Sequence, residues 1–249
     1  MISVTIITKN EEHNIARCLK SVEWADEIII VDSGSTDNTL SICNKFRCKI
    51  IQTEWKGFGN TKQVGVDACS NEWVLSIDAD EEVSLKLKEE LLEKTTQGHI
   101  TASAYTIKRN SYYLDREIKH SGWDNDYPLR LFLKKYGQFN NESVHESVII
   151  TDGTISTIHS PLLHYPYPTT EQHISKINLY TTLGAEKYFD KNKKSSISYA
   201  TLSGLVKFIK MYILKKGFLD GKEGFILCTL SAYGSFIKYI KLWEKNKLH

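Results

Sequence analysis

Residues 27–39, EIIIVDSGSTDNT, place an uninterrupted β-branched run directly before an acidic residue and a Gly/Ser/Thr turn. A run without polar alternation is typical of a strand covered on both faces, as in a parallel sheet between layers of helices. We predict a strand that ends at Asp32, a turn, and then a helix whose N-cap is Ser35 or Asp37. The stretch therefore indicates a strand–turn–helix unit.

The same order recurs on both sides of this unit. Strand patterns cover 2–10, 49–55 and 72–83, and helical spacings cover 11–22 and 61–70. Because strand and helix alternate in this way, the N-terminal part predicts an α/β fold with a mostly parallel sheet flanked by helices.

The pattern changes in the second half of the chain, where strands are isolated and the loops are rich in aromatic residues. Strands are predicted over 102–114, 127–135 and 147–151. A helix is predicted over 170–190, followed by a pair of helices over 200–243 that is split near 215–225, where three glycines favour a turn.

The composition is that of a folded globular protein, with 249 residues that are 41% hydrophobic and 25% charged. A formal net charge of +2 argues against nucleic-acid binding. Five scattered cysteines without a CxxC pair predict neither a disulfide framework nor a zinc site and fit a reducing cytoplasm. We see no secretory signal pattern and no uncharged apolar run of the roughly 18 to 20 residues that span a bilayer, so we expect no spanning helix.

The C-terminal tail is strongly basic. Residues 204–249 contain nine lysines and three acidic residues, whereas the rest of the chain carries net negative charge. An amphipathic, lysine-rich tail predicts binding to an anionic membrane surface, which makes the protein peripheral on the inner face of the cytoplasmic membrane. The alternative is that its apolar faces pack on the body of the protein or on another subunit of a homo-oligomer.

Polar residues follow three of the predicted strands. They are residues 8–12, 32–37 and 78–81. In an open α/β sheet, ligands bind beyond the carboxyl ends of the strands, so these residues are the candidates for a binding site.

The sequence Asp78-Ala79-Asp80 follows the apolar strand WVLSI. Two carboxylates one residue apart can both reach a hard divalent cation, Mg²⁺ or Mn²⁺, that also binds the oxygens of a diphosphate. The alternative is an acidic turn that caps the next helix. Asp32 is placed to accept a hydrogen bond from a uracil ring, or else only to cap its own turn.

Three motifs together resemble the nucleotide-binding half of the inverting family 2 glycosyltransferases of GT-A fold. They are VTIITKNEEHNI (4–15), IIIVDSGSTDNT (28–39) and SIDADEE (76–82). The resemblance implies that the donor, a UDP-sugar, is bound by residues at these positions: Thr8, Asn10, Glu12, Asp32, Asp78 and Ala79.

A fourth segment, GFGNTKQVGVDAC (57–69), is similar to the segment in which a basic residue approaches the nucleotide or its phosphates. That residue is Lys62 here, with a solvated helix residue as the alternative. The resemblance implies a metal held by Asp80 and Asp78, with His145 as a third metal or phosphate ligand or else a hydrogen-bonded loop histidine.

The second half resembles the subgroup that adds glucose to the heptose of the lipopolysaccharide inner core. The matching segments are GWDNDYPLRLF (122–132), SVHE (143–146), LLHYPY (162–167) and ILKKGFLDGKEGF (213–225). Asp124-Asn125 departs from the Tyr-Pro that this subgroup tends to have, which bears on the acceptor rather than on the reaction class.

An inverting transfer requires a base that takes the proton of the acceptor hydroxyl. The resemblance implies Glu146 for this role, with Asp126 second, and the alternative for each is an ion pair with Arg130. Trp123 and Tyr127 are candidates for stacking on acceptor sugars, as is Trp55, although buried aromatic residues are commoner. Arg130 is a further acceptor candidate.

These observations predict an enzyme that transfers a hexose, glucose from UDP-glucose, to a lipid-linked oligosaccharide, at a heptose of the lipopolysaccharide inner core. The expected segments are a nucleotide-sugar half (1–100), an acceptor half (101–195) and a helical tail (196–249). The alternatives are transfer to another surface glycan or a protein, a nonenzymatic nucleotide-sugar-binding module, and a nucleotidyltransferase, whose glycine-rich N-terminal loop is absent here.

Overall fold

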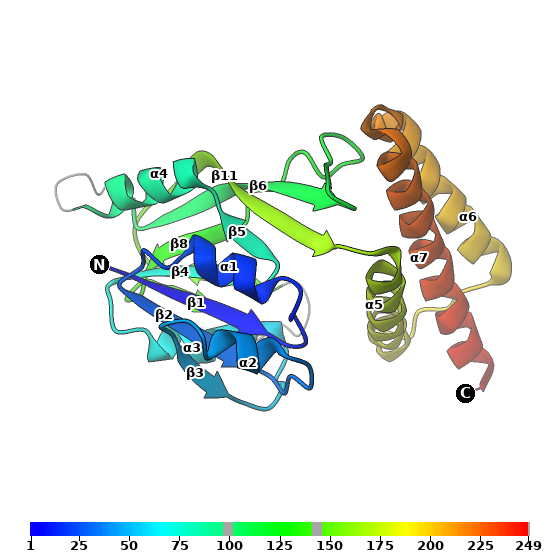
Figure 1. Cartoon of the computed structure of the whole chain (residues 1–249). Helices are drawn as coiled ribbons and strands as arrows, with labels where there is room; N and C mark the ends of the chain where they lie inside the picture. Colours follow the sequence, from blue (N-terminus) through cyan, green and yellow to red (C-terminus); the bar gives the residue numbers. More distant parts are fainter. Residues whose placement is uncertain (97–101, 141–145, 249) are drawn as a thin grey trace. The chain divides into compact units, whose positions relative to one another are not determined.

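The computed structural model describes residues 1–96, 102–140 and 146–248 (Figure 1). Within them, the chain divides into two compact units. The first contains Met1–Arg109 and Asp126–His164, and the second contains Asn110–Asn125 and the chain from Tyr165 onward. The second unit is therefore built from two segments that are far apart in the sequence.

The predicted α/β fold is confirmed, and its sheet is mixed. In the described residues the main sheet has nine strands, eight of them in the order β3-β2-β1-β4-β8-β6-β11-β5. The first four are parallel: β3 (Lys49–Gln52), β2 (Glu27–Asp32), β1 (Ile2–Thr8) and β4 (Trp73–Asp78). This half is the part that the uninterrupted Ile/Val runs predicted.

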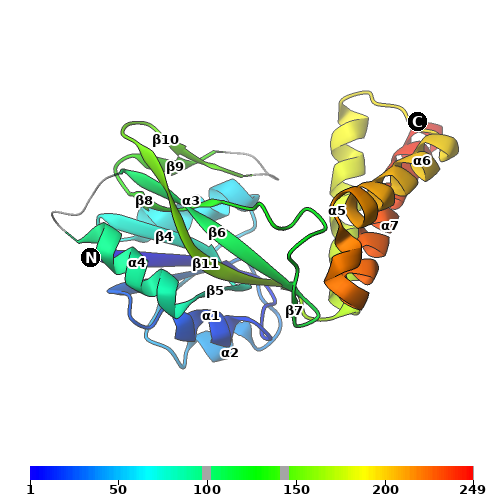
Figure 2. The ribbon, with the colours of Figure 1, turned by 90° about the horizontal axis from the view of Figure 1, so that it is seen from above.

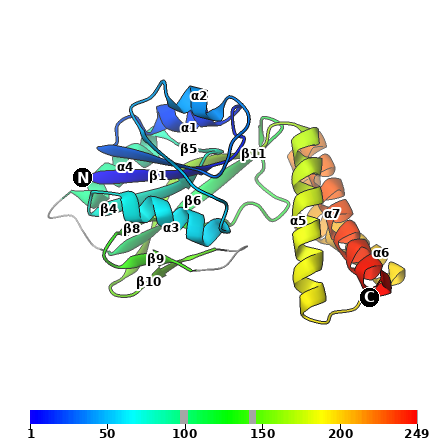
Figure 3. The ribbon, with the colours of Figure 1, turned by 90° about the horizontal axis from the view of Figure 1, so that it is seen from below.

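Both faces of the parallel half are covered, which is why its strands need no polar alternation. Alternate residues such as Val4 and Ile30 pack against α1 (Ile15–Ser21) and α4 (Leu85–Thr95). Their neighbours, such as Ile29, pack with Val66 of α3 (Phe58–Ala68). Helices α1 and α4 thus lie on one side of the sheet and α3 on the other (Figure 2 and Figure 3).

The remaining strands are largely antiparallel. They are β8 (Leu129–Leu133), β6 (Ala104–Tyr113), β11 (Ile155–Tyr167) and β5 (Glu81–Val83), with β7 (Arg116–Glu117) paired to β6. A separate pair is formed by β9 (Gly137–Phe139) and β10 (Val148–Ile150). The 13-residue strand β11 was not among the predicted strands.

The single strand predicted over 72–83 is wrong. The chain leaves β4 after Asp78, turns through Ala79 and Asp80, and re-enters the sheet as β5 beside β11. The break has a physical cause, because the fully buried Glu81 side chain turns back and accepts the backbone N–H of Asp78. The acidic pair therefore lies in a tight turn between two strands.

Two predicted helix starts also differ from the structure. Helix α2 (Thr39–Cys43) has Asn38 as its N-cap, because Asp32 holds the turn before it and Asp37 Oδ1 accepts the N–H of Thr39. The N-cap at Ser35 or Asp37 is therefore wrong. Helix α3 begins at Phe58, three residues before the predicted start, with Gly57 at a positive φ as its N-cap.

The predicted helices of the second unit are confirmed. They are α5 (Thr170–Asp190), α6 (Ile197–Phe208) and α7 (Gly221–Leu248), with a π-helix, η1 (Ile209–Leu214), and a 3₁₀ turn, η2 (Gly217–Asp220), between the last two. Buried Asp220 accepts the backbone N–H groups of Lys119 and His120, which fastens residues 118–121 to this turn.

Length and composition alone make two segments candidates for crossing a membrane. They are Ile197–Leu214 and Gly217–Leu248, each with a mean hydropathy of 1.2 and 17% of its window buried. The expectation that no segment of this kind exists is thus not supported, although the same test is passed by core helices of soluble proteins.

Candidate active site

The parallel strands bring three candidate residues to one edge of the sheet. In the register of the sheet, Thr8 pairs with Asp32 on β2 and Ile7 pairs with Asp78 on β4. The carboxyl ends of these strands therefore lie side by side, which is where ligands bind in open α/β sheets.

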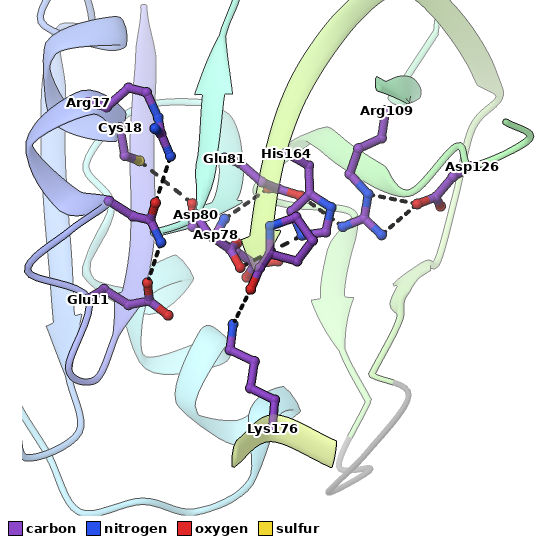
Figure 4. A network of polar contacts seen from close by, with 12 residues as sticks. Glu11, Arg17, Cys18, Asp78, Asp80, Glu81, Arg109, Asp126, His164 and Lys176 are labelled. Carbon is purple, nitrogen blue, oxygen red and sulfur yellow. Dashed lines mark hydrogen bonds and ion pairs between the residues drawn. The ribbon is translucent and has the colours of Figure 1, made fainter. Parts of the chain in front are cut away.

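A continuous chain of ion pairs runs from this edge into the antiparallel half of the first unit, and Figure 4 shows its end, where Arg109 lies between Glu81 and Asp126. Its members alternate in charge, in the order Glu146, Lys62, Asp78, Arg130, Glu81, Arg109 and Asp126. Five helices or strands of the first unit and two of its loops contribute to it, with one member each. The site is thus held together by electrostatics across the sheet.

Asp78 is the centre of this chain. Its carboxylate lies 2.8 Å from Lys62 Nζ and 2.6 Å from Arg130 Nη2. Burial would raise the pKa of Asp78, but the cations Arg130 and Lys62 outweigh it and lower the pKa well below its ordinary value. Asp78 therefore stays ionised and committed to two cations.

Glu81 extends the chain on the buried side. Its carboxylate has no exposed surface and lies 2.6 Å from Arg130 and 3.0 Å from Arg109. Burial lowers the pKa of Arg130, but Asp78 and Glu81 more than reverse this effect and raise it above the ordinary value. Each buried charge in this part of the site therefore has a partner of opposite charge.

Asp80 is arranged differently from Asp78. Its side chain is 12% exposed, and Oδ2 lies 3.7 Å from Nε2 of the His164 imidazole on β11. Within residues 1–96, 102–140 and 146–248, no group of three or more His, Cys, Asp or Glu side chains is arranged to hold a metal ion. Asp80 and His164 are thus a pair of potential ligands rather than a closed cage.

The candidates that follow β1 and β2 lie in two loops that are joined by hydrogen bonds. Both oxygens of the buried Asp32 carboxylate accept hydrogen bonds from the N–H of Ser35, and one also accepts that of Gly34. Asn10 Oδ1 accepts the N–H of Thr36, and Glu12 Oε2 accepts that of Asn38. Asp32 therefore caps its turn, and a further hydrogen bond from a uracil ring to its carboxylate stays a prediction.

Two further candidates lie beside these loops, and both are buried. Thr8 Oγ1 has no hydrogen-bond partner within the described residues, which is unusual for a buried hydroxyl. The side chain of Lys62 is 1% exposed, so the alternative that it is a solvated helix residue is wrong. Sequence did predict a basic residue here, but not its two carboxylate partners.

Both candidate bases are paired with cations, although not with the expected one. Glu146 is 2.7 Å from Lys62, and Asp126 is held by Arg109 through Nε at 2.7 Å and Nη2 at 2.6 Å. The alternative that either pairs with Arg130 is therefore wrong, because Arg130 is occupied by Asp78 and Glu81. His145 lies outside the described residues.

The aromatic candidates are in different surroundings. Trp123 packs in the second unit against Tyr113 and Tyr167, at centroid distances of 6.4 and 6.2 Å. Tyr127 is half-buried in the first unit, and Trp55 is 46% exposed beside Phe58. A stacking role for these rings stays a prediction.

Two residues of the site, Arg109 and His164, escaped the sequence analysis, and Glu81 was included only as the last residue of the polar stretch 78–81. Glu81 follows the acidic pair directly, so its proximity was available from sequence, but its burial was not. Arg109 and His164 lie on strands whose pairing partners are distant in the chain, and no local pattern marks them.

The family model for glycosyl transferase family 2 matches residues 3–159. The chain belongs to this family and is a glycosyltransferase, and the resemblance to family 2 and its GT-A fold is confirmed. It is 32% identical to an uncharacterised glycosyltransferase of Rickettsia conorii, covering 98% of this chain and 90% of that relative.

Two further likenesses bear on the same family. The chain is 27% identical to the lipopolysaccharide core biosynthesis glycosyltransferase LpsC of Rhizobium meliloti, covering 99% of this chain and 93% of LpsC. Among solved structures, it is distantly similar to residues 1–349 of S. aureus TarS in complex with UDP-GlcNAc. The sequence identity is 15%, the match covers 99% of this chain and 91% of the 1–349 chain, and the TM-score is 0.49.

Proposed function

We propose that this glycosyltransferase is an inverting enzyme that transfers glucose from UDP-glucose to a heptose of the lipopolysaccharide inner core. The observation that carries the proposal is the common edge formed by the ends of β1, β2 and β4. It presents Thr8, Asp32 and Asp78 together, followed by the turn that holds Asp80. Such an edge suits a nucleotide whose diphosphate extends toward the acidic turn.

The nucleotide of the donor binds along β1 and β2. The unpaired hydroxyl of Thr8 and the carboxylate of Asp32 are its first contacts, and the loops braced by Asn10 and Glu12 form the walls of its site. The Asp32 carboxylate already accepts hydrogen bonds from two backbone N–H groups, which fix its orientation. It therefore needs little reorganisation to accept a hydrogen bond from the N–H of the base as well.

The residues fit a divalent cation at Asp80 rather than at Asp78. Asp78 is neutralised by Lys62 and Arg130, whereas Asp80 offers a carboxylate beside the His164 imidazole. A carboxylate with an imidazole suits Mn²⁺ better than Mg²⁺, which prefers oxygen ligands alone. A cation there would be held by Asp80 and His164, and it would supply charge neutralisation for the leaving diphosphate.

Asp78 and Lys62 position the donor instead. Asp78, held in place by its two cations, faces the ribose or the backbone of the turn, and Lys62 balances it on the side toward Glu146. The ion-pair chain fixes these side chains before the substrates arrive, which is the preorganisation that electrostatic catalysis requires.

Glu146 acts as the base that removes the proton from the acceptor hydroxyl, and Asp126 is the second candidate. The Glu146 side chain is 20% exposed, so one side of it remains open to a substrate while Lys62 orients it. Attack on the face opposite the leaving diphosphate inverts the anomeric centre.

The acceptor assignment is supported by the similarity to LpsC, whose name places it in lipopolysaccharide core biosynthesis. We propose a lipid-linked oligosaccharide as the acceptor, with Tyr127 of the first unit in its recognition. Such an acceptor requires the enzyme to work in the cytoplasm at the inner face of the membrane.

The test is a transfer assay with purified full-length protein and four donors: UDP-glucose, UDP-galactose, UDP-GlcNAc and GDP-mannose. Heptose-containing inner-core oligosaccharide serves as the acceptor, and NMR reports the anomeric configuration of the product. We expect a β-glucoside from UDP-glucose only, lost with EDTA and restored by Mn²⁺. An α-linked product, preference for another donor, or activity indifferent to EDTA would contradict the proposal.

A further inference from the structure

The helical part of the second unit exposes a row of large apolar side chains. Beyond Ile197 and Tyr199 at the start of α6, six of them lie on α6 and η1 and are between 42% and 71% exposed: Leu202, Leu205, Val206, Ile209, Ile213 and Leu214. On α6 they recur at spacings of three and four residues, so they share one face of the helix. We call this set the apolar face.

The apolar face is not the packing face of α6. Ala200 and Gly204, on the other side of the helix, are buried, and a Cβ on Gly204 would stand 3.2 Å from the carbonyl oxygen of Ala232 on α7. A hydrogen bond between the hydroxyls of Ser203 and Ser235 fastens the same contact. Helices α6 and α7 therefore pack on each other (Figure 1), and the side chains of the apolar face remain exposed within the second unit.

The charge beside the apolar face has a single sign. Residues 197–219 contain four lysines, all exposed, and no acidic residue: Lys207, Lys210, Lys215 and Lys216. The two acidic residues that follow are engaged elsewhere, because buried Asp220 binds residues 119–121 and Glu223 lies 3.6 Å from Arg116. An apolar strip bordered only by cations is complementary to an anionic lipid surface.

The position of the lysines favours a helix that lies in the interface over one that crosses the bilayer. The segment Ile197–Leu214 is long enough to cross, but Lys207 and Lys210 lie near its middle and would stand close to the bilayer centre. Charged side chains at that depth are strongly unfavourable. In the interface, the same lysines reach the lipid phosphates while the apolar face enters the acyl boundary.

The rest of α7 is occupied within the unit. Lys241 donates hydrogen bonds to Asn178, Thr181 and Thr182 of α5, and Gly184 of α5 lies against the side chain of Lys238. The second half of α7 is thus a support that packs on α5. Exposed apolar side chains also occur on α5, such as Leu179, and at Tyr233 of α7, but those segments lie outside residues 197–219, where every charged side chain is a lysine.

We propose that the apolar face and its four lysines dock the enzyme onto an anionic phospholipid bilayer, with α6 and η1 parallel to the membrane plane. This inference deepens the proposed function. It rests on that function only for the purpose of docking, which is to bring the enzyme to a lipid-linked acceptor. The docking itself requires neither donor nor acceptor.

The test is flotation of full-length protein with vesicles of phosphatidylcholine alone or mixed equally with phosphatidylglycerol. We expect binding to the anionic vesicles only, weakened by salt. Changing the four lysines to Gln lowers the partition coefficient at least about a hundredfold, since each contributes about fivefold. The double variant Ile213→Ser with Leu214→Ser lowers it at least about tenfold, because less apolar area is buried.

Matched controls come from the first unit. Gln in place of Lys20, Lys45, Lys49 and Lys86, all exposed, removes the same charge, and Ile149→Ser with Ile155→Ser removes the same kind of exposed side chain. Both controls are expected to bind like the wild type. If they lose as much binding as the tail variants, attraction is not specific to this face and the proposal is overturned.

Three other results would overturn it. Equal binding to neutral and anionic vesicles would show that the lysines do not contribute to docking. Resistance of the bound protein to alkaline extraction would show that it spans the bilayer instead of lying on its surface. A dimer that binds no vesicles and becomes monomeric on Ile213→Ser with Leu214→Ser shows that a second copy covers the face. Transfer to soluble acceptor is measured in parallel. Failure of transfer with docking intact contradicts only the proposed function, whereas failure of docking with transfer intact contradicts only this inference.

Discussion

At the scale of single residues, the site depends on how each carboxylate is paired. Asp78 and Asp80 are separated by one residue but have opposite surroundings, two cations around the first and an imidazole beside the second. This difference is why we propose a positioning role for Asp78 and a metal-binding role for Asp80. The buried Glu81 carboxylate is paired in turn, because it forms ion pairs with Arg109 and Arg130.

The role of Glu146 is tested by Glu146→Gln. Because Lys62 keeps Asp78 as a partner, the variant is expected to fold and to bind UDP normally. Loss of the base lowers kcat about 10²- to 10⁴-fold, measured by transfer to the oligosaccharide acceptor. Asp126→Asn should cost less, and Glu89→Gln on the exposed side of α4 should change nothing. A larger loss in Asp126→Asn would transfer the role of base to Asp126.

The buried ion pairs of Glu81 predict a stability effect. Replacing Glu81 by Gln leaves two buried guanidinium groups without this carboxylate, and breaking such a network costs about 3–5 kcal/mol. Urea unfolding of the variant measures the loss in the free energy of unfolding. Glu89→Gln, at an exposed position, is the control and is expected to stay within about 0.5 kcal/mol of the wild type. Equal values for both variants would show that the network adds nothing.

Sequence predicted the carboxylates of this site better than their partners. Asp32, Asp78 and Asp80 follow apolar strands, and that local pattern is sufficient to place them. The contact between Lys62 and Glu146 joins residues 84 positions apart, and no local pattern encodes such a distance. The alternation of charge along the ion-pair chain therefore appears only in the folded protein.

At the scale of elements, hydrophobic patterns identified the parallel strands, the strands β6, β8 and β10, and the long helices, while interruptions hid β11 and the break between β4 and β5. Strand β11 contains Pro161 and Pro166, which are typical of turns and strand edges, so its 13 residues showed no strand pattern. The break between β4 and β5 depends on Glu81 being buried, and the π-helix η1 follows α6 without a change in composition.

One contact between elements predicts a pH dependence. His173 of α5 is buried, is stacked on Tyr167 and lies 3.0 Å from the Tyr113 hydroxyl. Burial, with a smaller effect of Lys176, lowers the pKa of His173 to about 4. A histidine pKa that is lower in the fold than in the unfolded chain adds stability above pH 6.5, and this stability is lost as the pH falls toward 4.

We therefore expect the free energy of unfolding to fall by up to about 3 kcal/mol between pH 6.5 and 4 through this one group. Urea unfolding across that range, compared with His173→Gln, isolates the contribution, because the carboxylates titrate in both proteins. Parallel curves for the wild type and the variant would contradict the prediction.

At the scale of the whole molecule, the chain forms two compact units whose boundaries do not follow the sequence. Residues 110–125 join the C-terminal helices through contacts such as that of His120 with Asp220, across 100 positions. The sequence predicted three continuous segments: 1–100, 101–195 and 196–249. A change in sequence pattern can mark a boundary along the chain, but it cannot show that residues 110–125 pack with helices that follow much later. Their division into donor, acceptor and tail functions stays a prediction.

The two units also have different electrostatic character, which gives each its proposed task. The first concentrates buried, alternating charges at the ends of parallel strands, and the second exposes apolar side chains beside lysines. The first suits a phosphorylated donor, and the second suits a lipid surface.

The central claim is that Asp80 holds the cation that fastens the donor diphosphate at the edge of the sheet. Isothermal titration calorimetry of UDP with Mn²⁺ tests it in wild type, in Asp80→Asn and in the exposed control Asp152→Asn. We expect Mn²⁺ to strengthen UDP binding at least about tenfold in the wild type and the control, and to have no effect in Asp80→Asn. If UDP binds Asp80→Asn with the same affinity and the same Mn²⁺ dependence as the wild type, the account is contradicted.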